Sequence, residues 1–333
     1  INGIRLSREM IQAFQTCLTA STGGNSLLYK KISHDRINMI CAGLHSNPGQ
    51  FLFSCCLDKK HLDPAEDMVL TDPEGPDLQL ITDKTGMVSV YPHHSDIRIL
   101  GSLLGLFGKG DIRFQHMVSS NAMISFVVET RDQESIVSLI KKGFSLPDSH
   151  TPFRQDIDED ISCFLKQYPE TRASYVEEKI KTYGISLTPN LDFFHICLAP
   201  ENLEPCGQAL VMDKTDDLRL VFCSAIKHPR TNGYDLMFVT SGAGPGFKDK
   251  LVLKLERLSD HRAQSFLHCD FISFHGPHFG DRYRILDTAL SCLHKQEVPI
   301  LAAGCTGASI GLVLPAGQGR PGCCALELGF EAP

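Results

Sequence analysis

The sequence lacks several features that would assign it to a particular class of protein. No apolar run approaches the ~20 residues that a bilayer-spanning helix needs, and the first residues have no signal-peptide pattern. Acidic residues outnumber basic ones by 39 to 32, so the net charge of −7 gives no electrostatic reason to bind nucleic acid. We therefore predict a cytoplasmic globular protein that binds neither a membrane nor nucleic acid.

The 13 cysteines form no CxxC pair, the spacing that is typical of zinc clusters. Several lie instead in apolar runs that resemble strands, such as residues 51–57 (FLFSCCL). Free cysteine packs as a small hydrophobic residue, and a reducing compartment keeps many thiols free. We predict buried thiols rather than disulfides or a zinc site.

What the sequence does contain is an internal repeat. Residues 97–129 align without a gap on residues 283–315, and residues 88–90 match residues 272–274 after a two-residue adjustment. A period of about half the chain indicates that one structural unit was used twice. Fold and function are therefore best argued from that unit.

The first copy predicts the order β-α-β-β-α. Ser95 or Asp96 can cap a helix whose apolar face starts at Ile97. Thr130 with Gln133 has the spacing of a capping box. The predicted strands are 86–92, 112–118 and 123–128, and the predicted helices are 97–107 and 136–144.

The second copy begins with the same order and then departs from it. Its predicted elements are a strand at 271–274, a helix over 283–293 and strands at 300–305 and 309–314. Glycines and a proline over 316–322 predict a loop in place of the second helix, followed by a strand-like segment over 323–330.

Two weaker partners precede the strong copies. The first, within residues 1–58, predicts a helix over 10–18 and strands at 37–42 and 51–57. The second, within residues 192–242, predicts strands at 193–198, 218–225 and 234–240, with a helix over 203–211. Residues 242–248 predict a flexible connection, because Pro245 removes an N–H donor that a phosphate loop would need.

These units predict an α+β fold of tandem ferredoxin-like modules, with antiparallel sheets that carry helices on one face. The expected boundaries are modules at 1–80, 81–150, 191–260 and 261–333, joined by a helical connection over 151–190. In the first of these modules the initial strand is the least certain part of the pattern.

The repeated unit resembles an ACT domain, and it is most similar to the regulatory ACT domains of aspartate kinases. Residues 119–128 (SSNAMISFVV) resemble the turn and third strand of those domains, and residues 278–286 (HFGDRYRIL) resemble their loop and first helix. The resemblance covers about residues 86–145 and 267–333. Nothing in the chain resembles the kinase catalytic domain.

The resemblance implies a regulatory or sensor protein whose paired modules bind a small amino acid at their interface, without catalysis and without a cofactor. The loop after the first strand and the turn between strands two and three would supply the contacts, since helix N-termini favour carboxylates and side-chain oxygens accept from ammonium groups. It also implies a partner, either a second copy paired through the sheets or another protein. The implied ligand-binding residues are Asp96, Ile97, Arg98, Ser119, Ser120, Asn121 and Ala122 in the first copy and Gly280, Asp281, Arg282, Thr306, Gly307 and Ala308 in the second.

Two alternatives stay open at this point. One is an enzyme that uses thiol or metal chemistry, in which Cys305 works with histidines of the loops at 91–94 and 275–278. The other is a pure assembly module without a working pocket. We expect no metal site, because no nearby Cys, His and Glu residues complete a coordination shell around those histidines.

Overall fold

The structure is a computed structural model. It describes residues 1–17, 27–47, 50–63, 65, 78–147, 153–154, 179–211, 218–229, 231–242, 244–277, 279, 283–307 and 309–331. No helix within these ranges is long and apolar enough to cross a membrane.

The described residues form a mixed fold of helices and mainly antiparallel strands. The strands are β1 (Gly3–Leu6), β2 (Met10–Cys17), β3 (Met39–Asn47), β4 (Gln50–Asp58), β5 (Leu78–Tyr91), β6 (His116–Ser119), β7 (Ile124–Glu129), β8 (Phe153–Arg154), β9 (Ile180–Lys181), β10 (Gly184–Leu198), β11 (Arg219–Lys227), β12 (Tyr234–Ser241), β13 (Ser259–His275), β14 (Ala302–Cys305), β15 (Ser309–Pro315) and β16 (Phe330–Glu331). The α-helices are α1 (Leu28–His34), α3 (Ile97–Lys109), α4 (Gln133–Gly143), α6 (Leu203–Leu210), α7 (Pro245–Leu258), α8 (Ile285–Lys295) and α9 (Gly319–Leu326).

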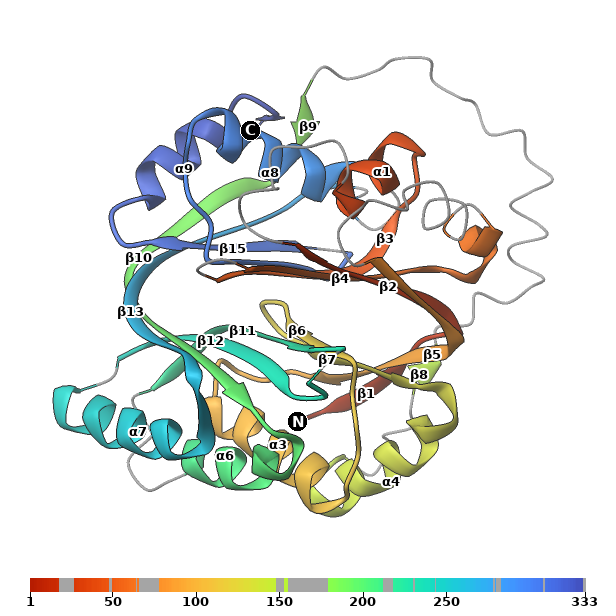
Figure 1. The fold of residues 1–333 in the computed structure, drawn as a ribbon, viewed down its shortest axis with the longest axis vertical. Coiled ribbons are helices and arrows are strands. Elements are labelled where there is room, and N and C mark those ends of the chain that lie inside the picture. Colours follow the sequence, from red (N-terminus) through yellow and green to blue (C-terminus); the bar gives the residue numbers. More distant parts are fainter. Residues whose placement is uncertain are drawn as a thin grey trace.

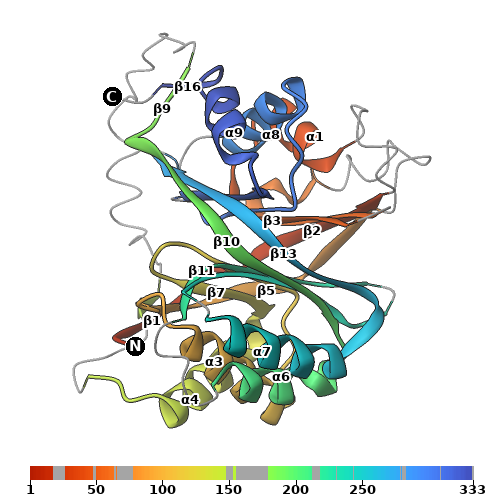
Figure 2. The same cartoon turned by 90° about the vertical axis from the view of Figure 1, so that its left-hand side faces the viewer.

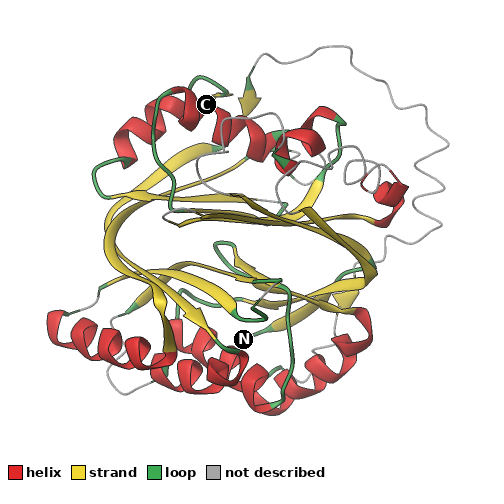
Figure 3. Ribbon diagram, in the orientation of Figure 1, coloured by secondary structure: helices red, strands yellow, loops and turns green. Residues whose placement is uncertain are grey.

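The main sheet closes on itself and is flattened into two layers. Its strand order is β2-β4-β3-β14-β15-β13-β10-β12-β11-β6-β7-β5-β1-β8, and a further pairing of β2 with β5 completes the ring. Figures 1 and 2 show the two layers stacked, with α1, α8 and α9 outside one layer and α3, α4, α6 and α7 outside the other. Figure 3 shows the strands of both layers between the two sets of helices.

The long strands β10 and β13 belong to both layers. The first part of β10 pairs with β13 beside β15, and its last part pairs with β12 in the other layer. The register shifts between Thr188 and Leu191, where Pro189 breaks the ladder and Asn190 adopts a φ of 56°. Both residues suit a β-bulge, which bends the strand from one layer toward the other.

The three largest apolar clusters among the described residues hold this arrangement together. Two of them fill the spaces between each layer and its helices. The third lies between the layers and joins Phe222 and Met237 of one layer to Phe271 and Val313 of the other. The burial of both faces of the sheet therefore accounts for the continuous apolar strands in the sequence.

The prediction of helices combined with antiparallel sheets is confirmed, and in the strong copies the order strand, helix, strand, strand, helix is observed. Of the two predicted caps, Ser95 and Asp96, the structure uses Asp96, whose side chain accepts from the Arg98 N–H at the start of α3. The capping box is wrong: Thr130 Oγ1 donates to the Lys84 carbonyl at 2.7 Å, and α4 begins without a side-chain cap.

The predicted helix over 10–18 is wrong, since Met10–Cys17 form strand β2. All eight of its residues are buried, because β2 lies between β4 and β5. A strand that is buried on both faces can carry apolar residues on either face. Apolar residues can then also occur three and four positions apart, the spacing that is typical of a helix. The helix of this segment is α1, further along the chain.

The predicted loop over 316–322 and the strand after it are also wrong, because Gly319–Leu326 form α9. The Asp270 carboxylate accepts from the N–H groups of Gly317 and Gly319 at 2.9 and 2.8 Å, which caps the helix start. A Cβ on Gly322 would lie 2.6 Å from Leu314, so this glycine permits close helix packing. The two copies therefore have the same order of elements, strand, helix, strand, strand and helix.

Two connections also differ from prediction. Helix α7 begins at Pro245, inside the expected flexible segment, because proline fits the first turn of a helix. Most of the predicted helical connection over 151–190 lies outside the described residues, but its last part forms β9 and the start of β10 rather than a helix.

Candidate ligand-binding site

The loop that follows β5 folds against the turn between β6 and β7. The backbone N–H of His93 donates to the Ala122 carbonyl at 2.9 Å, and His93 Nε2 lies 2.9 Å from the Ser120 carbonyl oxygen. The Ser95 N–H donates to His93 Nδ1 at 3.0 Å, which requires the neutral tautomer protonated at Nε2. Burial lowers the pKa of His93, so the ring is a neutral bridge between loop and turn.

A first cavity of about 460 Å³ opens beside this turn, within the size range of small-molecule sites. Exposed Asn121 and Arg219 bring an amide and a guanidinium to it. The residues that line it are His93, His94, Ser95, Asn121, Thr188, Arg219, Leu220, Val221, Ser241, Phe271 and Ser273. Because these come from both sheet layers, the cavity lies where the layers meet.

A second cavity of about 650 Å³ lies between other parts of the same two layers. It contains the Lys59–Glu9 ion pair, whose Nζ and Oε2 atoms are 2.6 Å apart. Its lining residues are Arg5, Ser7, Arg8, Glu9, Met10, Ile40, Cys41, Asp58, Lys59, Met87, Ser89, Met123, Ser125, Thr306 and Gly307. Charged side chains are therefore more numerous here than in the first cavity.

The internal repeat relates the two cavities. Three residues that line the first cavity have their repeat equivalents in the lining of the second. Phe271, Ser273 and Asn121 line the first cavity. Their equivalents Met87, Ser89 and Gly307 line the second. Each cavity thus combines a strand of one half of the chain with a turn of the other half. The start of β11 completes the first cavity, and the start of β3 completes the second.

The two turns differ in chemistry. Asn121 presents an exposed side chain to the first cavity. Gly307 has no side chain to present, and its φ is 73°. It also lies close to β3, because a Cβ at this position would be 3.1 Å from the Ile40 carbonyl oxygen. The first cavity is therefore the better site for polar recognition.

Three of the predicted ligand residues stabilise the start of α3 and do not line the first cavity. The Asp96 carboxylate accepts from the Arg98 N–H at 2.9 Å and from the Arg98 guanidinium at 2.8 Å, and the Arg98 hydrogen bond lowers the pKa of Asp96. Ile97 is fully buried in the core beneath the sheet. These residues hold the start of α3 in place beside the cavity.

The predicted serines are also used within the fold. Ser119 Oγ accepts from the Cys223 N–H at 2.8 Å, which ties β6 to β11, and Ser120 Oγ accepts from the Met123 N–H at 3.2 Å. Thr306 lines the second cavity. Four predicted residues lie outside the described ranges: Gly280, Asp281, Arg282 and Ala308.

The surroundings of Cys305 do not favour nucleophilic chemistry. Burial raises the pKa of its thiol to about 11, whereas a nucleophile needs the thiolate. The His275 ring packs against Tyr183 with centroids 5.3 Å apart, and His278 lies outside the described ranges. None of the cysteines that the structure describes forms a disulfide, and most of them are buried.

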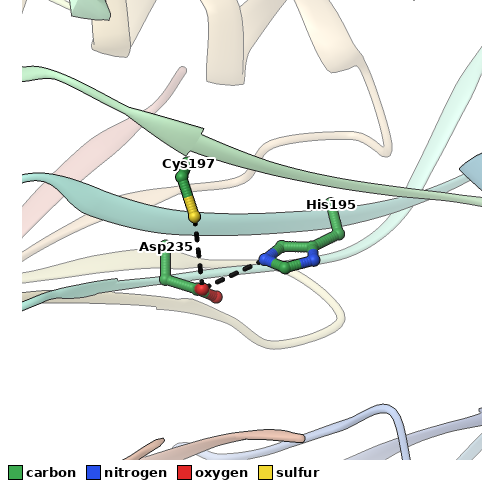
Figure 4. A group of neighbouring side chains, drawn as sticks. All are labelled: His195, Cys197 and Asp235. Carbon is green, nitrogen blue, oxygen red and sulfur yellow. Dashed lines mark hydrogen bonds and ion pairs between the residues drawn. The ribbon is translucent and has the colours of Figure 1, made fainter. Parts of the chain in front are cut away.

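A buried polar cluster centred on Asp235 was missed by sequence reasoning. Asp235 Oδ1 lies 2.6 Å from His45 Nδ1, and Oδ2 lies 3.0 Å from His195 Nε2 and accepts from Asn47 Nδ2 at 2.9 Å. Cys197 Sγ is 3.7 Å from the same oxygen, as Figure 4 shows with His195. Because β3 supplies His45 and Asn47, the cluster connects the two layers.

Charge compensation explains how this carboxylate is tolerated inside the protein. Burial opposes its ionisation, but His195 and His45 together hold the pKa of Asp235 well below its usual range. Burial in turn lowers the pKa of His45, against the opposing effect of Asp235. The ionised carboxylate is thus held by hydrogen bonds from both layers.

The same cluster has the connectivity of a catalytic triad. His45 Nε2 lies 2.8 Å from Ser224 Oγ, so a serine, a histidine and an aspartate are linked in series. Ser224 and His45 are both 0% exposed and Asp235 is 4% exposed, and a substrate cannot reach them. We therefore assign this cluster to structure rather than hydrolysis.

One signal in the sequence indicates part of the cluster. His195 and Cys197 alternate along a strand, so they share one face. Two further features depend on the tertiary fold and have no local sequence pattern. One is the strand register that places Asp235 beside Cys197. The other is the approach of β3 from the other layer.

Comparisons with known proteins show the fold. No protein family model matches the chain, and no curated protein matches it either. Among solved structures, the aspartate kinase from Synechocystis is similar with a TM-score of 0.74 and 11% identity, over 99% of this chain and 56% of that one. The chain therefore spans just over half the length of that aspartate kinase.

Regulatory subunits of aspartate kinases are also among the similar structures. The ligand-free subunit from Thermus thermophilus has a TM-score of 0.38 and 13% identity, over 44% of this chain and 99% of that one. The subunit from Thermus flavus has a TM-score of 0.39 and 12% identity, over 44% and 99% respectively.

Proposed function

We propose that the chain is a regulatory protein that binds a small amino acid in the first cavity and is not itself catalytic. The observation that carries this proposal is the pair of repeat-related cavities at the junctions between the two halves. The fold is consistent with it, because the similarity to the Synechocystis aspartate kinase extends over 99% of this chain but only 56% of that enzyme.

The proposed architecture is four ACT-like modules at 1–80, 81–150, 191–260 and 261–333, connected through residues 151–190. Two antiparallel ladders support the pairing of these modules. Strand β6 pairs with β11, and β14 pairs with β3. Each ladder joins sheets that belong to different proposed modules.

The chemistry of the first cavity suits an α-amino acid. The Arg219 guanidinium can bind the carboxylate through two parallel hydrogen bonds. The Asn121 side-chain oxygen and the hydroxyl group of Ser273 can accept from the ammonium group. Val221 and Phe271 offer apolar surface to a side chain.

Binding would act by favouring one conformation or one partner complex over another. A dimer joined through the sheets is disfavoured, because the β3–β14 and β6–β11 ladders already use those edges within the chain. We therefore propose that the regulated partner is another protein or another domain.

A calorimetric and thermal-shift screen of the common amino acids tests this function. We expect one amino acid to raise the melting temperature, with a stabilisation of about 2.7 kcal/mol at a hundredfold excess over its Kd. Arg219→Ala should weaken that binding more than tenfold, because it removes the carboxylate partner.

Arg131→Ala is the matched control, since Arg131 is exposed, pairs with Glu129 and does not line the cavity. Wild-type protein that no amino acid stabilises would overturn the proposal and favour an assembly role. Equal losses in Arg219→Ala and Arg131→Ala would exclude this cavity as the site.

A further inference from the structure

We propose that His195, Cys197 and Asp235 form a binding site for a divalent metal ion of the zinc class. One imidazole nitrogen, one thiol sulfur and one carboxylate oxygen lie within 4.8 Å of one another. In Figure 4 the thiol and the imidazole both point toward the Asp235 carboxylate. This cluster is separate from both cavities and does not depend on amino-acid binding.

The separations between ligand atoms fit a tetrahedral ion. His195 Nε2 lies 3.0 Å from Asp235 Oδ2, and Cys197 Sγ lies 3.7 Å from the same oxygen. Zinc bonds of about 2.0–2.3 Å to nitrogen, oxygen and sulfur set neighbouring ligand atoms roughly 3.2–3.8 Å apart. The nitrogen and the sulfur lie within 4.8 Å of each other, so side-chain rotations that bring these two atoms closer would complete the set.

The backbone holds the three ligands in this arrangement. Cys197 is directly opposite Asp235 in the β10–β12 ladder, and His195 is two residues from Cys197 on the same face of β10. Both strands have a hydrogen-bonded neighbour on each side. A site built on such strands is more precise than a site built on loops.

The surrounding groups orient the carboxylate ligand. Asn47 donates to Asp235 Oδ2, and His45 Nδ1 lies 2.6 Å from Oδ1. Outer hydrogen bonds of this kind fix the direction of metal ligands and strengthen binding. The mixture of imidazole, thiolate and carboxylate selects zinc-class ions over magnesium or calcium, which prefer oxygen alone.

Charge and access are also consistent with an ion. Asp235 is 4% exposed, so a nearby cation offsets the cost of burying its charge. Cys197 is only partly buried, which gives the ion a route from the surface. On binding, the Cys197 thiol loses its proton to solvent as the sulfur–metal bond forms, and the neutral His195 ring binds through Nε2 with its proton on Nδ1. Three protein ligands leave a fourth position for water.

Cobalt(II) and zinc(II) titrations of the full chain, prepared free of metal, test this site. We expect one equivalent of cobalt to give the near-ultraviolet charge-transfer band of a thiolate–cobalt bond, and zinc to remove that band. Cys197→Ser should abolish the band, and His195→Gln should weaken zinc binding by about tenfold or more. Cys324→Ser is the matched control, because Cys324 is an exposed cysteine on α9.

Alkylation of the wild-type protein, located by mass spectrometry, gives a readout that does not depend on a folded variant. We expect zinc to slow the modification of Cys197 at least tenfold while Cys324 reacts at an unchanged rate. Equal rates at Cys197 with and without zinc would overturn the proposal. A cobalt band that Cys324→Ser removes and Cys197→Ser retains would also overturn it.

Discussion

Gly101 on α3 and Gly207 on α6 meet so closely that neither position has room for a side chain. A Cβ on Gly101 would lie 2.7 Å from the Gly207 carbonyl oxygen, and a Cβ on Gly207 would meet the backbone of Gly101 and Gly105. The two helices, which cover the same layer (Figure 1), therefore pack backbone against backbone.

We predict that Gly207→Ala destabilises the protein by about 1–3 kcal/mol, because an added methyl group must push the two helices apart. The free energy of unfolding in urea measures this effect. Gly105→Ala is the control on α3, since its Cβ would have nothing within 4 Å. That control should stabilise by roughly 0.5–1 kcal/mol, because alanine favours the helix. Equal effects at the two positions would contradict the close helix contact.

Stability should fall as the pH drops below about 6.5. Burial lowers the pKa of His45 in the folded protein, so below the unfolded value of about 6.5 the unfolded chain binds more protons than the folded one. His93 shifts in the same direction because of its burial. Each such group contributes a slope of at most about 1.4 kcal/mol per pH unit.

Urea unfolding of wild type and His45→Gln between pH 7.5 and 5.5 checks this dependence. We expect the substitution to reduce the slope, whereas His34→Gln, at a side chain that is 90% exposed, should leave it unchanged. Below about pH 4 a second loss should follow in the wild type, because the lowered pKa of Asp235 keeps it ionised only in the folded state. A wild-type slope that persists unchanged in His45→Gln would exclude His45 as its source.

The cysteines should differ sharply in reactivity. Burial raises the pKa of Cys305 to about 11 and those of Cys206 and Cys223 to about 12. At pH 7.5 iodoacetamide should therefore modify exposed Cys324 at least a hundredfold faster than these three. Mass spectrometry of the native and urea-unfolded chain measures the rates. Rapid modification of Cys305 in the native protein would contradict this prediction and favour the alternative of an enzyme that uses this thiol.

The internal repeat predicted much of the fold, because equivalent residues in the two copies repeat the same burial pattern. Helices α3 and α8 and the strands that follow them lie where the alignment placed them. The failures came from segments whose environment is set by distant parts of the chain. Strand β2 is buried on both faces, and α9 is capped by Asp270 from another strand.

The site was predictable only in part for the same reason. The turn at Asn121 follows from local residue types, and it lines the first cavity. Arg219 and Phe271 join that cavity because the two halves of the chain pack against each other. The Asp235 cluster needs β3 of one layer to approach β12 of the other, and no local pattern specifies that approach.

The passage of β10 and β13 through both layers limits how this molecule can move. Sliding one layer over the other, or separating them as hinged lobes, would break the hydrogen bonds of ladders that both strands share. The bulge at Thr188–Leu191 is where curvature can change at the lowest cost. A rearrangement that changes how the two layers sit must therefore bend or twist β10 and β13, since both strands run through both layers.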